Sequence, residues 1–160
     1  MNNKYKLVCT KCGKVIEDFA TWFEMNQECP CGCKRAEVVY SADYHKITEL
    51  TKPEHKPTNF YHYFDFLPVM DENNIVTFGE GAIPIEEWEF LEKLAKEKYG
   101  IDCKVMVYRN DLNGGSNTFK DVAAALAASV MKENGIKEYC VASTGNTATA
   151  FSKYLAKAGI

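Results

Sequence analysis

Five of the seven cysteines lie between positions 9 and 33, at spacings that suit a metal ion better than disulfide bonds. Cys9 and Cys12 are separated by two residues and are followed by Gly13. Such a turn points two thiolates at one place, and the glycine permits the tight backbone path behind them. Because zinc prefers four tetrahedral ligands of this kind, the segment predicts half of a zinc site.

The second half of the predicted zinc site offers three cysteines for two places. We favour Cys29 and Cys31, because Gly32 follows Cys31 just as a glycine follows the first pair, and Cys33 is the alternative. Four thiolates leave no open position for water or substrate, so the ion is expected to be structural rather than catalytic. The histidines match no common ligand spacing, and packing or surface roles are expected for His45, His55 and His62.

Lys120 is a second residue whose surroundings suit chemistry. It follows the glycine-containing loop RNDLNGGSN and lies in the first turn of a helix predicted from about Thr118 to Glu133. The positive end of a helix and apolar neighbours both disfavour an ammonium ion. A neutral amine is the form that reacts with a carbonyl group. Taken alone, the same position also fits an ordinary solvated lysine.

A third candidate is the loop Ser143-Thr144-Gly145-Asn146-Thr147, which joins a predicted strand to a predicted helix. The backbone N–H groups and the helix dipole at such a junction favour an anion, for example a substrate carboxylate. Serine, threonine and asparagine are also the preferred helix caps. A capped helix without a ligand is therefore the alternative.

The elements that position these residues alternate between strand and helix. A helix is predicted from Pro84 to the glycine at position 100, with an apolar face formed by Trp88, Leu91, Leu94 and Ala95. Strands are predicted at 103–108 and 138–143, and each precedes a helix, of which the second ends at Gly159. This alternation predicts an α/β fold with a parallel sheet.

The predicted sheet is incomplete, because the chain reaches Ile160 where the pattern requires another parallel strand. Cys103 and Cys140 each lie in a strand-like apolar run, and we expect both to be small buried side chains. Three parts are predicted along the chain. Residues 1–41 form a small zinc-ribbon-like β module, 42–74 a connector with an aromatic segment, and 75–160 the start of the α/β domain.

Together these features resemble the pyridoxal-5'-phosphate (PLP) enzymes of fold type II, the tryptophan synthase beta superfamily, and within them threonine synthase. The resemblance covers nearly the whole chain. Beyond the cysteine turns, it is carried by Phe66-Leu67-Pro68, Gly79-Glu80-Gly81 with Pro84 close behind, Thr118-Phe119-Lys120-Asp121, and Ser143-Thr144-Gly145-Asn146-Thr147-Ala148. It implies a three-layer parallel sheet, of which this chain contains only the beginning.

The resemblance implies PLP as a cofactor and gives a role to each candidate. Lys120 forms the internal aldimine with PLP, and Asn146 donates a hydrogen bond to the phenolic oxygen of the cofactor. Ser143, Thr144 and Thr147 hold the α-carboxylate of a small amino-acid substrate. The implied activity is that of a lyase in amino-acid biosynthesis, converting O-phospho-L-homoserine to L-threonine.

Two alternatives remain open. Thr118 stands where the family usually has serine, and Val122-Ala123 stand where it has Arg-Gly. These departures leave room for a cysteate synthase or cysteine synthase-like β-replacement on O-phosphoserine. A non-catalytic zinc-ribbon binding module with a degenerate α/β domain is the alternative from another class.

In the family that this chain resembles, the phosphate-binding loop and the partner of the pyridine nitrogen come further along the chain. Neither is expected within these residues, so we expect a fragment that binds PLP weakly and is inactive on its own, and the resemblance allows a homodimer at full length. The net charge of -3 comes from mixed acidic and basic residues, which excludes a nucleic-acid partner. No apolar run has the length of a signal peptide or a membrane span, so a cytoplasmic protein is expected.

Overall fold

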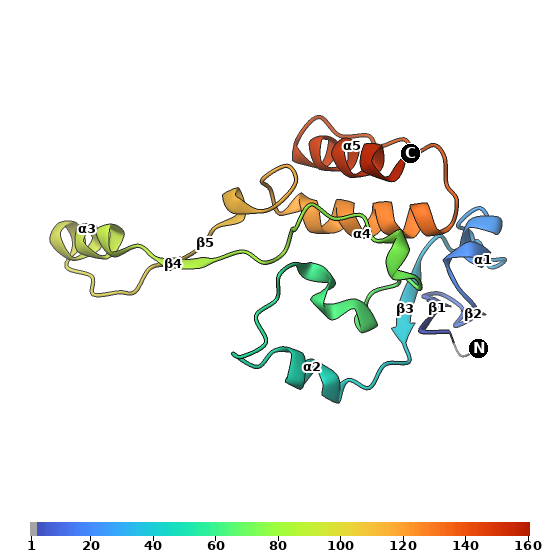
Figure 1. Ribbon diagram of the computed structural model, residues 1–160, viewed down its shortest axis with the longest axis horizontal. Coiled ribbons are helices and arrows are strands. Elements are labelled where there is room, and N and C mark those ends of the chain that lie inside the picture. Colours follow the sequence, from blue (N-terminus) through green and yellow to red (C-terminus); the bar gives the residue numbers. More distant parts are fainter. Residues whose placement is uncertain (1–2) are drawn as a thin grey trace.

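The computed structural model describes residues 3–160. Figure 1 shows a small β module with the amino terminus, a body built on two long helices, and an arm that projects away from the body. Both sheets are antiparallel, one of three strands and one of two. The described residues contain no helix that is both long and apolar enough to cross a membrane.

The cysteine module, residues 3–41, contains the three-stranded sheet and one short helix. Its elements are β1 (Tyr5–Cys9), β2 (Val15–Ile16), α1 (Phe19–Glu24) and β3 (Ala36–Tyr40), and β1 lies in the middle of the sheet. Alternate residues of β1 are buried, which is the period of a strand with one covered face. Trp22 of α1 packs into the same core, which also contains two of the cysteines, Cys9 and Cys29.

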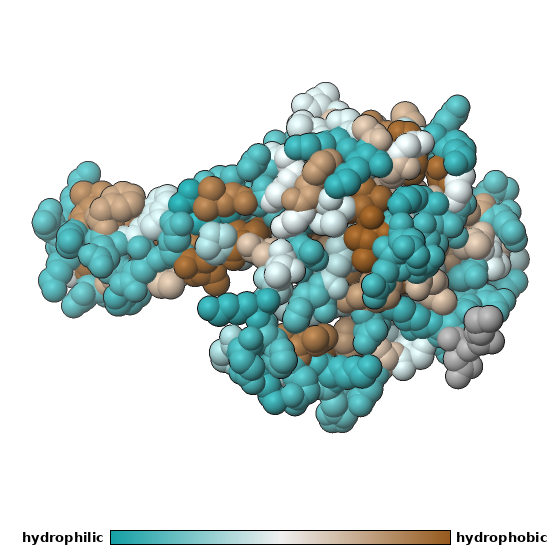
Figure 2. Space-filling model, viewed as in Figure 1, coloured by the Kyte–Doolittle hydropathy of each residue, from teal (hydrophilic) through white to brown (hydrophobic). Residues whose placement is uncertain are grey.

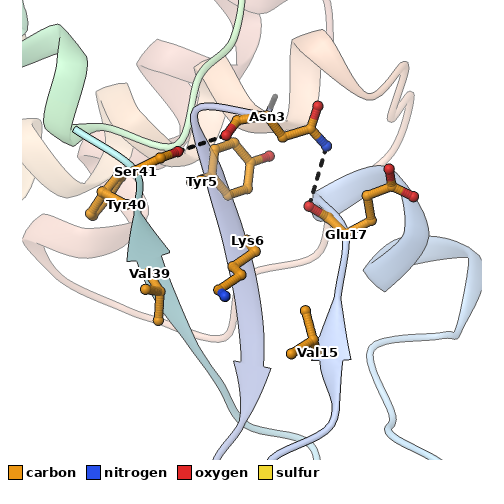
Figure 3. Close-up of a pocket in the computed structure, with 8 residues that line it drawn as sticks. All are labelled: Asn3, Tyr5, Lys6, Val15, Glu17, Val39, Tyr40 and Ser41. Carbon is orange, nitrogen blue, oxygen red and sulfur yellow. Dashed lines mark hydrogen bonds between the residues drawn. The ribbon is translucent and has the colours of Figure 1, made fainter. Parts of the chain in front are cut away.

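A pocket of about 650 Å³ lies on this module, against the first residues of β1 and the ends of β2 and β3 (Figure 3). It contains no candidate from the sequence. Its lining is mixed in polarity, and it consists of Asn3, Tyr5, Lys6, Val15, Glu17, Val39, Tyr40 and Ser41.

The connector after the module contains more helix than the sequence indicates. The segment forms α2 (His45–Leu50) and then the 3-10 helix η1 (Phe60–Phe66), followed by η2 (Glu72–Asn74). Tyr61 of η1 is buried, and its hydroxyl contacts Ser129 Oγ at 2.6 Å. The aromatic segment is therefore part of the body core.

The body is built on α4 (Lys120–Glu133) and α5 (Asn146–Ala158), which pack side by side (Figure 1). Small side chains at Ala124, Ala125 and Ala128 are fully buried and allow close approach to α5. The helix predicted from about Thr118 is confirmed, with its start two residues later. Gly159 ends α5 in a left-handed conformation, with φ of 77°, as the sequence predicts.

The arm, residues 85–108, differs from the prediction. The helix expected from Pro84 begins only at Glu89, because Ile85–Glu87 form β4 and pair with β5 (Met106–Tyr108). The end of this helix, α3 (Glu89–Tyr99), is correct, since Gly100 caps it in a left-handed conformation. The predicted apolar face has no buried residue, and Figure 2 shows apolar surface exposed along the arm.

The expected incomplete three-layer parallel sheet is absent from residues 3–160. Residues 138–143 form no strand, and 103–108 contributes only the short antiparallel β5. A strand needs a neighbour to complete its backbone hydrogen bonds, and the described chain offers 138–143 none. Cys103 and Cys140, predicted to be buried in strands, are consequently exposed.

Candidate functional site

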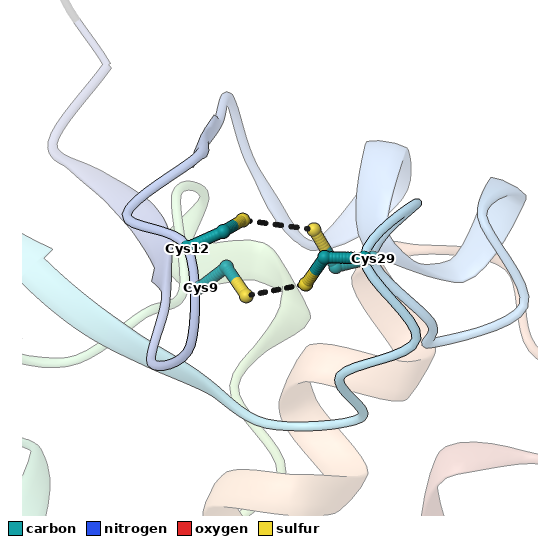
Figure 4. A group of neighbouring side chains, drawn as sticks. Cys9, Cys12 and Cys29 are labelled. Carbon is teal, nitrogen blue, oxygen red and sulfur yellow. Dashed lines mark hydrogen bonds between the residues drawn. The ribbon is translucent and has the colours of Figure 1, made fainter.

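Four cysteine thiols meet at one point of the cysteine module. The sulfur atoms of Cys9, Cys12, Cys29 and Cys31 all lie within 4.8 Å of one another. Cys9 Sγ is 3.6 Å from Cys31 Sγ, and Cys12 Sγ is 3.6 Å from Cys29 Sγ (Figure 4). This set can hold a metal ion, and four soft thiolate donors in such a cluster suit zinc.

Two similar turns deliver these thiols. Gly13 N–H donates to Cys9 O at 3.0 Å, and Gly32 N–H donates to Cys29 O at 2.7 Å. Both glycines have positive φ, 72° and 78°, a conformation that other residues adopt only with strain. The equivalence that the sequence suggested for the two glycines is thus present in the backbone.

The fifth cysteine of the segment lies outside the cluster. Cys33 Sγ is 3.5 Å from Thr10 Oγ1 and 3.5 Å from the carbonyl oxygen of Arg35. The backbone carbonyl of Cys33, rather than its thiol, supports the site, because it accepts a hydrogen bond from Cys29 N–H at 2.9 Å. Of the two alternatives for the fourth thiol, the geometry brings Cys31 into the group.

The thiols of the cluster do not ionise alike. Hydrogen bonds, first from the Lys14 backbone and then from neighbouring thiols, lower the pKa of Cys12 to about 7. Desolvation raises the pKa of Cys31 to about 12. A divalent cation would supply the charge that lets all four ionise together. The histidines take no part; for example, His62 Nε2 lies 3.0 Å from the carbonyl oxygen of Leu50.

Lys120 is the first residue of α4 and is half-buried. Its Nζ lies 4.3 Å from the centroid of the exposed Phe119 ring. The neighbouring carboxylate of Asp121 is fully buried and accepts hydrogen bonds from Ser116 N–H, Ser116 Oγ and Thr118 N–H at 2.8, 2.6 and 2.9 Å. The loop before Lys120 is therefore folded back onto the first turn of α4.

A buried polar residue ties this loop to the Gly79-Glu80-Gly81 turn. Asn113 Oδ1 accepts from Gly81 N–H at 2.9 Å, and Asn113 Nδ2 donates to Thr118 O at 2.8 Å. Asn113, Glu80, Asp121 and Tyr154 are polar residues at most 2% exposed that the sequence did not single out as functional. For Asn113 and Glu80 the sequence did contain a signal, because each is a polar residue inside or beside a glycine-containing turn.

The second candidate loop leads into α5. Asn146 is the first residue of this helix and is exposed, and the N-cap residue Gly145 offers no side chain to the free N–H groups. Ser143 Oγ accepts from Gly145 N–H at 3.4 Å. Ser143 and Thr147 are half-buried, whereas Thr144 is exposed. The start of α5 thus keeps donors that an anion could use.

The two helices run in the same direction. Lys153 of α5 donates a hydrogen bond to Gly115 O, near the start of α4. One turn later in α5, Lys157 donates to Thr77 O. Thr77 follows Val76, whose N–H donates to Ser129 in the second half of α4. Figure 1 shows the same arrangement, with both helices starting at the end of the pair nearer the arm. The segments that carry Lys120 and Asn146 consequently lie at the same end of the helix pair.

Curated threonine synthases are similar to this chain. That of Methanocaldococcus jannaschii is 30% identical over 94% of this chain, that of Halalkalibacterium halodurans 38% over 61%, and that of Methanosarcina acetivorans 32% over 83%. The chain spans 35%, 26% and 34% of these proteins, respectively. No protein-family model and no solved structure matches it significantly. The matches support a threonine-synthase-like family, and the chain covers about a third or less of the length of these relatives.

Proposed function

We propose that the chain is part of a PLP-dependent lyase that converts O-phospho-L-homoserine to L-threonine. The observation that carries the proposal is that α4 and α5 begin at the same end of the helix pair, α4 at Lys120 and α5 at Asn146. The similarity to threonine synthases over 94% of the chain supports it. The activity of a whole protein, its substrate and a homodimeric state are all part of this proposal.

The residue types at this end suit PLP. Lys120 would hold the cofactor covalently through a half-buried primary amine, and Asn146 would offer an exposed side-chain amide to its phenolic oxygen. Ser143, Thr144 and Thr147, with the uncapped N–H groups of α5, suit the α-carboxylate of an amino acid. When bound, PLP supplies an electron sink for the substrate carbon that loses its proton.

The protein residues would position groups and move protons. With substrate bound, the Lys120 amine would take a proton from the substrate carbon and return it. The buried Asp121 carboxylate keeps the first turn of α4 in place during this exchange, since it holds Ser116 and Thr118 by hydrogen bonds. The α5 N–H groups orient the carboxylate of the substrate.

The four clustered cysteines have a separate, structural role in this proposal. Four thiolates complete a tetrahedral zinc site and leave no position for substrate. A core of six buried residues is small, and a metal ion is a common way to stabilise such a module. We propose Cys9, Cys12, Cys29 and Cys31 as its ligands.

The experiment that tests the lysine assignment uses the 160-residue chain with PLP. Borohydride reduction fixes PLP to the amine that holds it, and mass spectrometry of the digest identifies the lysine. We expect preferential modification of Lys120 and its loss in Lys120→Ala. Lys137→Ala is the matched control, because Lys137 is an exposed lysine just beyond α4. Modification spread evenly over the exposed lysines would contradict the proposal.

A further inference from the structure

Glu80 is a fully buried carboxylate with unequal oxygen atoms. Its Oε2 accepts hydrogen bonds from Tyr154 Oη at 2.8 Å, Phe78 N–H at 2.9 Å and Thr77 Oγ1 at 3.1 Å. Its Oε1 is buried and has no hydrogen-bond partner among residues 3–160. All of the hydrogen bonding of this side chain is therefore concentrated on one oxygen.

Burying such a group costs folding free energy, because a carboxylate leaves water without an opposite charge beside it. None of the ion pairs in the described part of the chain includes Glu80. A buried, incompletely satisfied polar group that a protein retains calls for a specific role. The contacts of Glu80 indicate what this role is.

On one side, Glu80 supports the loop that precedes Lys120. A side chain on Gly114 would come within 2.5 Å of Phe78 O and 2.9 Å of Glu80 N, so the loop rests directly on the turn that carries Glu80. Gly81, the residue after Glu80, donates its backbone N–H to Asn113 Oδ1 in the same loop.

On the other side, Glu80 is bonded to α5, the helix that begins at Asn146. The hydroxyl of Tyr154 also lies 3.4 Å from Gly114 O, and a side chain on Gly115 would come within 2.4 Å of it. Tyr154 is fully buried. The hydroxyl thus touches both the turn and the loop.

We propose that Glu80 and Tyr154 are positioning residues that set the place of Lys120 relative to Asn146. The hydrogen bond between them joins the turn beneath the Lys120 loop to the helix that carries Asn146. This inference rests on the proposed function, because the proposed PLP chemistry is what gives the spacing of Lys120 and Asn146 a purpose. Burial and then the bond to Glu80 raise the pKa of Tyr154, so its hydroxyl remains a donor at neutral pH.

The test compares two variants that each lose one buried tyrosine hydroxyl. Tyr154→Phe removes the bond to Glu80. Tyr61→Phe is the matched control, because its hydroxyl bonds Ser129 and Ala125 O in the middle of α4, away from the Lys120 loop. In each folded chain, the reactivity of the Lys120 amine is measured without PLP, by competitive reductive methylation against Lys137, and the NMR signal of methylated Lys120 is recorded.

We expect Tyr154→Phe to change the relative methylation rate of Lys120 by about threefold or more, because the amine is displaced from its place. The NMR signal of Lys120 should move as well, while Tyr61→Phe leaves both unchanged. Should Tyr154→Phe fail to fold, Glu80→Gln replaces it, because it weakens the same bond from charge-assisted to neutral. A smaller change in the methylation rate of Lys120 is then expected.

The outcomes separate this inference from the proposed function. If the Lys120 rate and NMR signal are unchanged in the folded test variant, the positioning role is overturned, even where PLP is trapped on Lys120 in the wild type. A similar change in Tyr61→Phe would overturn it as well, because general loosening of the body would be the cause. If the rate changes selectively but PLP is not trapped on Lys120, the positioning pair stands and the proposed function fails.

Discussion

Cys31 Sγ lies 3.6 Å from Cys9 Sγ, although the two residues are 22 positions apart and Cys33 is available two residues later. Because Cys33 instead faces Thr10 and Arg35, Cys31→Ser should lose most of its zinc to a competing chelator. Cys33→Ser should retain about one zinc ion per chain. Atomic absorption of the dialysed proteins measures both. Equal zinc retention by the two variants would show that either thiol can complete the site.

Gly115 should tolerate a methyl group much less well than Gly135. Both have positive φ, 86° and 67°, but a side chain at Gly115 would come within 2.4 Å of Tyr154 Oη, whereas nothing lies within 4 Å of one at Gly135. Gly135→Ala therefore costs only backbone strain, about 1 kcal/mol. Gly115→Ala should cost about 3 kcal/mol, because steric repulsion is added. Urea denaturation gives both values, and similar losses would argue against a tight loop.

Ser129 connects three segments of the body core. Its hydroxyl donates to Ala125 O at 2.8 Å, accepts from Val76 N–H at 2.9 Å and contacts Tyr61 Oη. Ser129→Ala leaves a buried N–H group without its partner and should lower the free energy of unfolding by about 2 kcal/mol. Ser152→Ala, on the exposed side of α5, should change it by less than about 0.5 kcal/mol. Matching losses in urea denaturation would contradict this role for Ser129.

Lys4 should make stability depend on pH above neutrality. Burial lowers the pKa of Lys4 from 10.5 to about 8, although Asp65 opposes the shift. Between these values the unfolded chain binds more protons at Lys4 than the folded chain does, so the folded state gains stability as the pH rises.

Lys4→Met removes this titration and keeps an apolar side chain near Phe64, over whose ring the amine lies. The free energy of unfolding of Lys4→Met, relative to that of the wild type, should therefore be highest at about pH 7, and this advantage should be lost by about pH 10. Lys6→Met, at an exposed neighbouring position on β1, is the control. Denaturation curves at the two pH values provide the measurement, and a constant difference for Lys4→Met would refute the expectation.

Features fixed by neighbouring residues were predictable from the sequence. The spacing of Cys9, Cys12 and Gly13 anticipated a turn that the structure contains, and Gly159 marked the end of α5. These features depend on local backbone geometry, which residue types within a few positions determine.

Features fixed by distant partners were not predictable in this way. Pairing with Met106–Tyr108 delays the start of α3 past Ile85–Glu87, and the strand expected at 138–143 lacks a partner in the described chain. The bond from Tyr154 to Glu80 spans 74 positions. No residue near Tyr154 in the sequence could indicate a buried carboxylate opposite its hydroxyl.

The sequence separation between contacting residues also affects the order of folding. Contacts among the clustered cysteines join residues 17 to 22 positions apart, whereas those from α5 to the turn at Glu80 span 74 to 80. Closing a short loop costs less entropy and takes less time than closing a long one. During synthesis the cysteine module can therefore close before α5 leaves the ribosome. Among residues 3–160, the contact between Glu80 and Tyr154 should be one of the last to form.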